Sequence, residues 1–202
     1  MQEIILSFVI IMQIIVPAFL VYKYENTLKH GEVYRFNVSP IDPYDPFRGR
    51  YVYLDFELVT VQYNGEKDIK YGQFVYANLD KDENGHAVFN EIFTEKPKVG
   101  NYLKVKFLGN YGIFGEDDTR YNIGFIFDRY YSQESKALKI ENAVSDNRGQ
   151  RGVDNESAET VSARVRIKDG LGVIEELYIG ELTIHEYLAQ KESLNTTQDH
   201  TK

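Results

Sequence analysis

The sequence predicts a mainly β protein, an antiparallel barrel-like or sandwich domain with one short helix, preceded by an N-terminal transmembrane helix. Three observations support this fold class. Residues 4–22 carry no charge and are long enough to cross a bilayer as a helix. Beyond residue 31, short alternating runs of polar and apolar residues are separated by turn signals. The chain also contains 16 Tyr and 12 Phe, aromatic residues that favour strands.

The apolar N-terminal segment runs from Ile4 to Tyr22 without a charged side chain. Because about 20 apolar residues span the hydrocarbon core, we predict an anchor over residues 1–24 that contacts the lipid bilayer through Ile4 to Tyr22. A cleaved signal peptide and a buried core helix are the alternatives. A signal peptide needs a positive n-region and a small-x-small cleavage site, and neither is found around the Met-Gln-Glu start or Pro17.

The charges and the lack of cysteine limit the possible partners and chemistry. A net charge of −8 without a basic stripe argues against nucleic acid as a partner. The absence of cysteine excludes disulfides and thiol catalysis, and it suits an oxidising compartment. Lys23 and Lys29 follow the apolar segment and no basic residue precedes it, so the positive-inside rule favours a cytoplasmic domain instead.

Along the chain we predict a neck over residues 25–31 that ends at Gly31, and a β domain over residues 32–185. The alternating runs predict strands at 32–38, 50–62, 73–79, 86–93, 102–108, 112–115, 121–127, 161–167 and 172–179.

The segments between these strands are predicted from their turn and helix signals. Asn64-Gly65 is a hairpin-type turn signal, and residues 80–85 and 168–170 join hairpins, the second of which closes the barrel-like fold. Residues 132–144 have helical spacing, residues 145–158 are predicted to be a mobile loop, and residues 186–202 a flexible tail.

A proline-rich corner precedes the long strand, reading PIDPYDPFRGRYVYLDF over residues 40–56. Proline fixes φ and removes an amide donor, so the three prolines predict a stiff, extended approach to the strand. The residues that we assign to this structural corner are Pro40, Asp42, Pro43, Asp45, Pro46, Arg48, Gly49, Arg50, Tyr51, Leu54 and Phe56.

Within the corner, Arg48 lies near Asp42 and Asp45 in sequence. A guanidinium can bind a carboxylate through two parallel hydrogen bonds, and a rigid proline frame would hold that geometry. Two hypotheses follow, an internal clasp that locks the corner beneath the strand, or a contact with a ligand or partner.

The corner resembles the signature of the GDYXXLXY family of membrane-anchored bacterial proteins. The matching residues are Pro40-Ile41-Asp42-Pro43 and Arg48-Gly49-Arg50-Tyr51-Val52-Tyr53-Leu54-Asp55-Phe56, with further similarity at 79–85, 94–97 and 129–131. Two signature positions differ, since Arg50 replaces an acid and Phe56 replaces a tyrosine. The resemblance implies a protein anchored in the bacterial inner or cytoplasmic membrane, and we expect its domain to be extracytoplasmic. It implies no activity.

A second motif matches the calcium-loop pattern D-x-D-x-N-G-x5-E, from Asp80 through Asp82, Asn84 and Gly85 to Glu91. Carboxylates at alternate positions offer oxygen ligands to a hard cation. However, this calcium-binding loop normally lies between helices, whereas the flanking segments here alternate like strands. Asp-Glu-Asn-Gly between two such segments is more typical of a hairpin turn.

Catalytic patterns are weak in this sequence, and we predict no catalytic residues, no metal ligands and no cofactor. His185-Glu186 lacks the second histidine of H-E-x-x-H, and the adjacent acids Glu175 and Glu176 should point to opposite faces of a strand. We therefore expect a membrane-anchored, non-enzymatic binding or accessory module that acts with an integral-membrane partner. The alternatives are an envelope-associated enzyme with a pocket near Arg48 and Arg50, and a calcium-stabilised domain that binds through Asp80 to Glu91.

Overall fold

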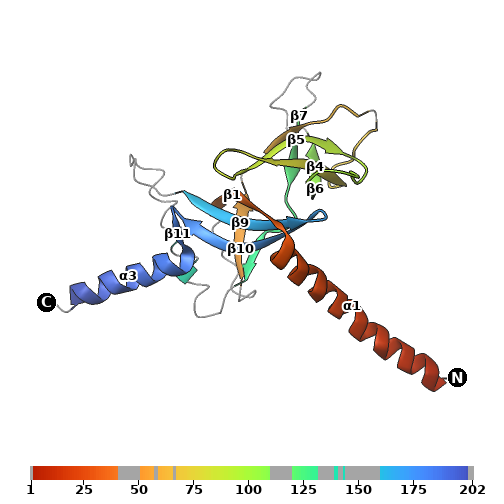
Figure 1. Ribbon diagram of the computed structural model, residues 1–202, viewed down its shortest axis with the longest axis horizontal. Coiled ribbons are helices and arrows are strands. Elements are labelled where there is room, and N and C mark those ends of the chain that lie inside the picture. The colour runs from red at the N-terminus through yellow and green to blue at the C-terminus, as the bar shows by residue number, and fades with distance from the viewer. Residues whose placement is uncertain are drawn as a thin grey trace.

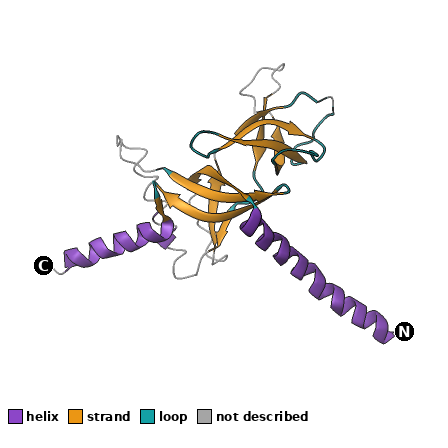
Figure 2. Ribbon diagram, in the orientation of Figure 1, coloured by secondary structure: helices purple, strands orange, loops and turns teal. Residues whose placement is uncertain are grey.

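The computed structural model describes residues 2–40, 51–56, 59–65, 67–109, 120–131, 139–140, 143 and 160–199. Within these residues the protein is mainly β, with two sheets and two helices that project from them (Figures 1 and 2). The helices are α1 (Gln2–His30) and α3 (Ile184–Asp199), which point away from the sheets in different directions. The predicted fold class is therefore confirmed.

Six strands form an open antiparallel sheet in the order β11-β10-β9-β1-β2-β8. Their bounds are β11 (Leu182–Thr183), β10 (Leu171–Ile179), β9 (Val161–Lys168), β1 (Glu32–Pro40), β2 (Tyr51–Phe56) and β8 (Arg129–Tyr131). The alternation predicted for β1 is confirmed, because Tyr34, Phe36 and Val38 are buried while Val33 and Arg35 are half-buried.

The open sheet is strongly curled. The Tyr130 hydroxyl in β8 donates a 2.9 Å hydrogen bond to the Glu176 carboxylate in β10, although three strands separate β8 from β10. In a flat sheet these two strands would lie about 19 Å apart, beyond the reach of two side chains. A register shift between Ile174 and Glu176 lets Glu176 point into the curled sheet, where it also accepts the Leu177 amide at 3.1 Å.

The second sheet is a closed barrel of five strands in the order β3-β5-β4-β6-β7. Their bounds are β3 (Val59–Gln62), β4 (Phe74–Lys81), β5 (Ala87–Phe93), β6 (Tyr102–Gly109) and β7 (Arg120–Gly124). All neighbours are antiparallel except β3 and β5, which are parallel. Buried apolar side chains fill this part of the protein, among them Val61, Val75, Ala77, Val105 and Ile123.

The barrel is an insertion in the open sheet. The chain leaves the sheet after β2, forms β3 to β7, and returns at β8, which pairs directly with β2 through Val52 and Tyr130. The strand predicted over residues 50–62 is therefore corrected to two strands in different sheets, β2 and β3. The hairpin turn predicted at Asn64-Gly65 is also wrong, because β3 pairs with β5 and β7 and not with β4.

The hairpin of β9 and β10 was predicted correctly, but it does not close the barrel, since both strands belong to the open sheet. Asp169 and Gly170 at its turn both have positive φ, 51° and 79°. Positive φ at both central positions defines a type I′ turn, for which Asp-Gly is a preferred sequence. The local turn chemistry was thus readable from the sequence, whereas the sheet to which the hairpin belongs was not.

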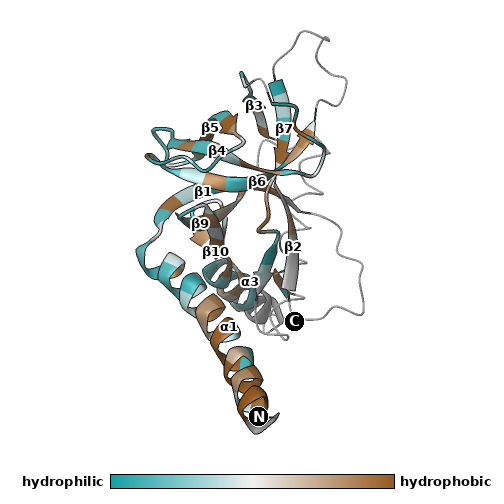
Figure 3. Ribbon diagram, turned by 90° about the vertical axis from the view of Figure 1, so that its right-hand side faces the viewer, coloured by the Kyte–Doolittle hydropathy of each residue, from teal (hydrophilic) through white to brown (hydrophobic). Residues whose placement is uncertain are grey.

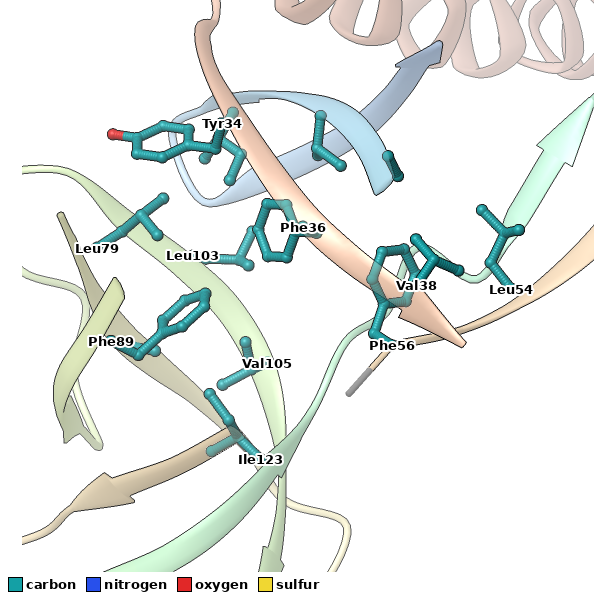
Figure 4. Packing of buried hydrophobic residues seen from close by; sticks show 14 of the residues in the cluster. Tyr34, Phe36, Val38, Leu54, Phe56, Leu79, Phe89, Leu103, Val105 and Ile123 are labelled. Atoms are coloured by element: carbon teal, nitrogen blue, oxygen red, sulfur yellow. The ribbon is translucent and has the colours of Figure 1, made fainter. Parts of the chain in front are cut away.

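Five phenylalanines join the sheet to the barrel, and we call them the aromatic joint: Phe36, Phe56, Phe89, Phe125 and Phe127. The Phe36 ring lies 5.1–6.1 Å from the other four ring centroids. Most of these pairs are edge-to-face or tilted, arrangements that aromatic quadrupoles favour. Figure 4 shows Phe36 and Phe56 from the sheet beside Phe89 and Leu103 from the barrel.

Polar contacts add to this joint near the start of β1. The Glu32 carboxylate accepts hydrogen bonds from the Tyr34 hydroxyl and the Asn101 amide, each at 2.9 Å, and Lys81 of β4 lies 3.4 Å away. The hydrogen bond from Tyr34 is the main reason that the pKa of Glu32 is lowered. Burial raises the pKa of Tyr34, so both groups favour the neutral tyrosine beside the ionised carboxylate.

Helix α3 replaces the flexible tail that we predicted for residues 186–202. Thr183 and Glu186 form a capping box, in which the Thr183 amide donates to Glu186 Oε2 at 2.9 Å and the Glu186 amide donates to Thr183 Oγ1 at 3.3 Å. Ile184 is fully buried, and Tyr187 and Leu188 pack against the core. The T-x-x-E spacing was visible in the sequence, but the polar composition that follows it suggested disorder.

Other predicted segments lie largely or wholly outside the described residues. Within the predicted helix over residues 132–144, Lys139, Ile140 and Ala143 are helical, and Ile140 and Ala143 are buried. The predicted loop over residues 145–158 and the strand at 112–115 lie outside the described residues.

We predict that Tyr130→Phe destabilises the protein at neutral pH by about 1.5–3 kcal/mol, because it removes a hydrogen bond to a carboxylate. Burial and Glu176 raise the pKa of Tyr130 above its ordinary value. The folded state therefore holds this proton more tightly than the unfolded state, and stability falls as pH rises above about 10.

The variant lacks this group, so its unfolding free energy should fall less steeply above about pH 10 than that of the parent. Denaturant unfolding at pH 7 to 11 measures both effects. The control is Tyr187→Phe, since the Tyr187 hydroxyl makes no hydrogen bond within the described residues. Equal alkaline slopes for parent and Tyr130→Phe would contradict the prediction.

Candidate functional site

The first part of the candidate site is the junction between α1 and β1. The helix ends at His30, and β1 begins at Glu32, so only Gly31 lies between them. The Gly31 amide donates to the Thr27 carbonyl at 2.8 Å, and Thr27 is buried at 1% exposure. Because the helix continues to the first residue before the strand, its direction relative to the sheet is fixed by packing.

Glycine is required at position 31 by close approach. A Cβ there would lie 2.5 Å from the Thr27 carbonyl oxygen and 3.1 Å from the Ile167 amide nitrogen. Both are backbone atoms and cannot rotate away. The prediction that the helix ends at Gly31 is confirmed, although the reason is the contact with β9 and not a left-handed backbone.

The outward face of the open sheet carries the second part of the site. Arg35 in β1 is the direct cross-strand neighbour of Arg164 in β9, and Arg166 lies two residues further along β9. We define the arginine face by the side chains Arg35, Arg164, Arg166, Glu175 and Tyr178. Arg166 connects this face to the junction, because its Nη1 donates to the Gly31 carbonyl at 3.3 Å.

Glu175 is held by two of these arginines. Its carboxylate accepts two hydrogen bonds from Arg166, at 2.9 and 3.1 Å, and its Oε2 lies 3.0 Å from Arg164 Nε. The Glu175 side chain is 25% exposed. A bidentate pair of this kind fixes the orientation of both side chains. One carboxylate thus neutralises part of the charge of two guanidinium groups.

Tyr178 is shared by two of the arginines in a different way. The Cζ atoms of Arg35 and Arg164 each lie 5.3 Å from the centroid of its buried ring, a cation–π distance. The nearest carboxylate to Arg35 is that of Glu181, at 3.9 Å, and Glu181 is 90% exposed. An exposed pair at this distance contributes little, so Arg35 is weakly neutralised.

The arginine face therefore has an excess of positive charge on a chain of net charge −8. It holds three guanidinium groups and one firmly paired carboxylate. Within the described residues, neither Arg35 nor Arg164 donates a hydrogen bond, and about a third of each side chain is exposed. Guanidinium groups bind carboxylate and phosphate oxygens through paired N–H groups, so this surface can bind an acidic group.

Glu175 and Glu176 behave as their adjacency predicted. Glu175 contacts arginines on the outward face, and Glu176 accepts the Tyr130 hydroxyl inside the curled sheet. The two carboxylates are therefore not arranged as an acid–base pair.

The barrel has two open hollows at the connection between β3 and β4. One, of about 710 Å³, is lined partly by the aromatic rings of Tyr63, Tyr71, Phe107 and Tyr121. The other, of about 600 Å³, shares Tyr63 with the first and includes the exposed ion pair of Lys67 and Glu95. These hollows offer aromatic surface with few converging polar groups, which is less specific than the arginine face.

Most residues of the predicted corner lie outside the described residues: Asp42, Pro43, Asp45, Pro46, Arg48, Gly49 and Arg50. Pro40 ends β1 opposite Leu54, Tyr51 begins β2, and Leu54 and Phe56 are buried in the core. The clasp and the pocket near Arg48 and Arg50 stay predictions.

The structure uses the calcium-like motif as a turn. The Asp82 carboxylate accepts the backbone amides of Asn84 at 2.9 Å and His86 at 2.7 Å, and these bonds, led by that of His86, lower its pKa. Gly85 has a φ of 80°. Within the described residues, no three acidic or histidine side chains come together as metal ligands. The hairpin that we favoured from the flanking strands is confirmed.

The arginine face was missed in the sequence, although one signal for it was present. Ser162, Arg164 and Arg166 alternate with Val161, Ala163 and Val165, which places both arginines on one face of a strand. The partners Arg35 and Tyr178 come from other strands, and only the sheet register brings them together.

The fold and the site define a two-part β protein with a long, exposed apolar helix and a cationic face beside the helix junction. The chain belongs to the GDYXXLXY family, because the family model described as GDYXXLXY protein matches residues 13–177. The match begins within α1 and ends within β10, so it covers both sheets. No curated protein and no solved structure matches this chain.

We predict that Gly31→Ala lowers the unfolding free energy by about 1–3 kcal/mol, the usual effect of overpacking. The added methyl group must displace the Thr27 carbonyl or the Ile167 amide. Denaturant unfolding of the full chain in detergent, followed by near-UV circular dichroism, measures the change. Lys29→Ala, on the exposed side of the same helical turn, is the control. If both variants unfold like the parent, the junction is not closely packed.

Proposed function

We propose that this protein is a membrane-anchored, non-enzymatic binding or accessory module that acts with an integral-membrane partner. In this proposal α1 is a single-pass anchor in a bacterial inner or cytoplasmic membrane, and the β domain is extracytoplasmic. The observation that carries the proposal is the continuous helix, which is apolar and exposed at one end and packed into the β domain at the other (Figure 3).

The dimensions of α1 support anchoring. The 19 residues from Ile4 to Tyr22 make a helix of about 28 Å, close to the thickness of the hydrocarbon core. None of the apolar window is buried against the rest of the protein. Tyr22 and Tyr24 lie at its end, where aromatic side chains favour the membrane interface. An apolar helix of this length and exposure is unfavourable in water.

The same helix sets the distance of the domain from the bilayer. From Lys23 to His30 it continues for about 12 Å before the sheet begins. Because the junction has no flexible linker, the arginine face is held at a fixed height and direction. A rigid position near the membrane suits recognition of an acidic segment that an integral-membrane protein exposes at its surface.

The chemistry of the arginine face supports binding over catalysis. A guanidinium group stays charged in proteins, so it does not transfer protons. The Glu175 carboxylate is already occupied by two arginines. The groups on this face can therefore bind and orient an acid, and the partly exposed Arg35 and Arg164 are the two available for it.

We predict that the full chain stays with the membrane after an alkaline wash and is released by detergent, because α1 crosses the bilayer. In intact cells, protease added outside should remove the β domain if the domain is extracytoplasmic. An internal cytoplasmic protein serves as the control for cell integrity. Release by alkali contradicts the anchor, and protection from protease contradicts only the proposed orientation.

We predict that replacing both Arg35 and Arg164 with Gln reduces recovery of an integral-membrane partner by about tenfold or more, since each lost charged contact costs 2–5 kcal/mol in a desolvated interface. Recovery is measured by co-purification from detergent-solubilised membranes. Lys67→Gln, on the barrel, is the matched control, and unfolding curves verify that all three proteins are folded. Equal recovery by all three contradicts the role of the arginine face.

A further inference from the structure

Gln13 and Pro17 place unusual polar groups in the middle of α1. Gln13 is the central residue between Ile4 and Tyr22, and its side chain is exposed. Pro17 lies inside the helix and has no amide hydrogen, so the backbone carbonyl four residues earlier loses its helical hydrogen bond. That carbonyl belongs to Gln13. One residue thus presents both a side-chain amide and a free main-chain acceptor.

These groups are costly at the depth where α1 would place them. In the hydrocarbon core no water can satisfy an open carbonyl or amide, and each unpaired group costs several kcal/mol. Within the described residues, no hydrogen bond joins the Gln13 amide to another side chain. Ser7 is about 9 Å away along the helix axis and cannot reach it. The missing partner must come from outside the helix.

We propose that α1 pairs with α1 of a second copy of this chain through Gln13, an inference that rests on the proposed membrane anchor. A carboxamide carries both donors and an acceptor, so two copies related by a two-fold axis satisfy each other. The amide of each Gln13 donates to the side-chain or main-chain carbonyl of the other. Glutamine side chains stabilise helix pairs in bilayers in this way.

A second copy is the occupant that the observations favour. A different helix would need a polar group of its own at the same depth, whereas a second α1 brings the amide and the open carbonyl at the matching position. The exposed apolar surface from Ile4 to Tyr22 leaves this position open for pairing, because none of it is covered by the β domain.

The pairing can be measured by energy transfer between two labelled copies of the full chain in liposomes. The chain has no cysteine, so Val99→Cys, at a position that is 89% exposed, gives a single labelling site. We expect transfer that depends on the protein-to-lipid ratio. Gln13→Leu should weaken pairing about three- to thirtyfold, the range for one interhelical hydrogen bond.

Two further variants test the chemistry. Gln13→Asn keeps the carboxamide and should retain most of the pairing. Pro17→Ala restores the missing amide hydrogen, so the Gln13 carbonyl is satisfied within the helix and pairing should weaken by a smaller factor. Met12→Leu, the apolar neighbour, is the control and should pair like the parent.

The outcomes separate this inference from the proposed function. If the parent withstands an alkaline wash of the liposomes but shows no transfer at any lipid ratio, the anchor stands and the pairing is wrong. If Gln13→Leu pairs as well as the parent, the contact lies elsewhere and the inference is overturned. If the parent is removed by the wash, both the anchor and the pairing fail.

Discussion

The packing of Phe36 in the aromatic joint is the interaction on which the architecture depends. The barrel is inserted between the neighbouring strands β2 and β8, so the two chain crossings between sheet and barrel lie side by side. Phe56 precedes one crossing, and Phe125 and Phe127 lie on the other. Their rings surround Phe36, and without this contact two covalent connections would act as a hinge. Several aromatic pairs, each about 0.5–1.5 kcal/mol beyond burial, resist that motion.

Strand β1 carries this constraint to the rest of the protein. Its inward residues form the core and the joint, while Arg35 on its outward side contributes to the arginine face. Its first residue follows Gly31 at the end of α1. The alternation of one strand thus couples the helix direction, the sheet–barrel contact and the position of the cationic surface. A change at any of these places is transmitted through a stiff, central, hydrogen-bonded strand.

The sequence predicted those features that depend on local physics. The uncharged run to Tyr22, the alternation in β1 and the Asp169-Gly170 turn are each determined by nearby residues, and all three are confirmed as helix, strand and turn. The division of residues 50–62 between two sheets depends on distant partners, and periodicity cannot reveal it. The arginine face combines three strands, so its members are neighbours only after the register of β1, β9 and β10 is known.

The arginine face has a cost that its structural contacts offset only in part. Arg35 and Arg164 lie directly opposite each other on paired strands, and like charges in such positions are destabilising. The Tyr178 ring and Glu175 reduce that repulsion, yet the positive charge still exceeds the negative charge held there. A purely structural network would be balanced by a second buried carboxylate, whereas Glu181 remains exposed at 3.9 Å. The incoming acidic group of a partner would complete the balance, and two paired helices would present two such faces together, which strengthens binding to a partner with matching spacing.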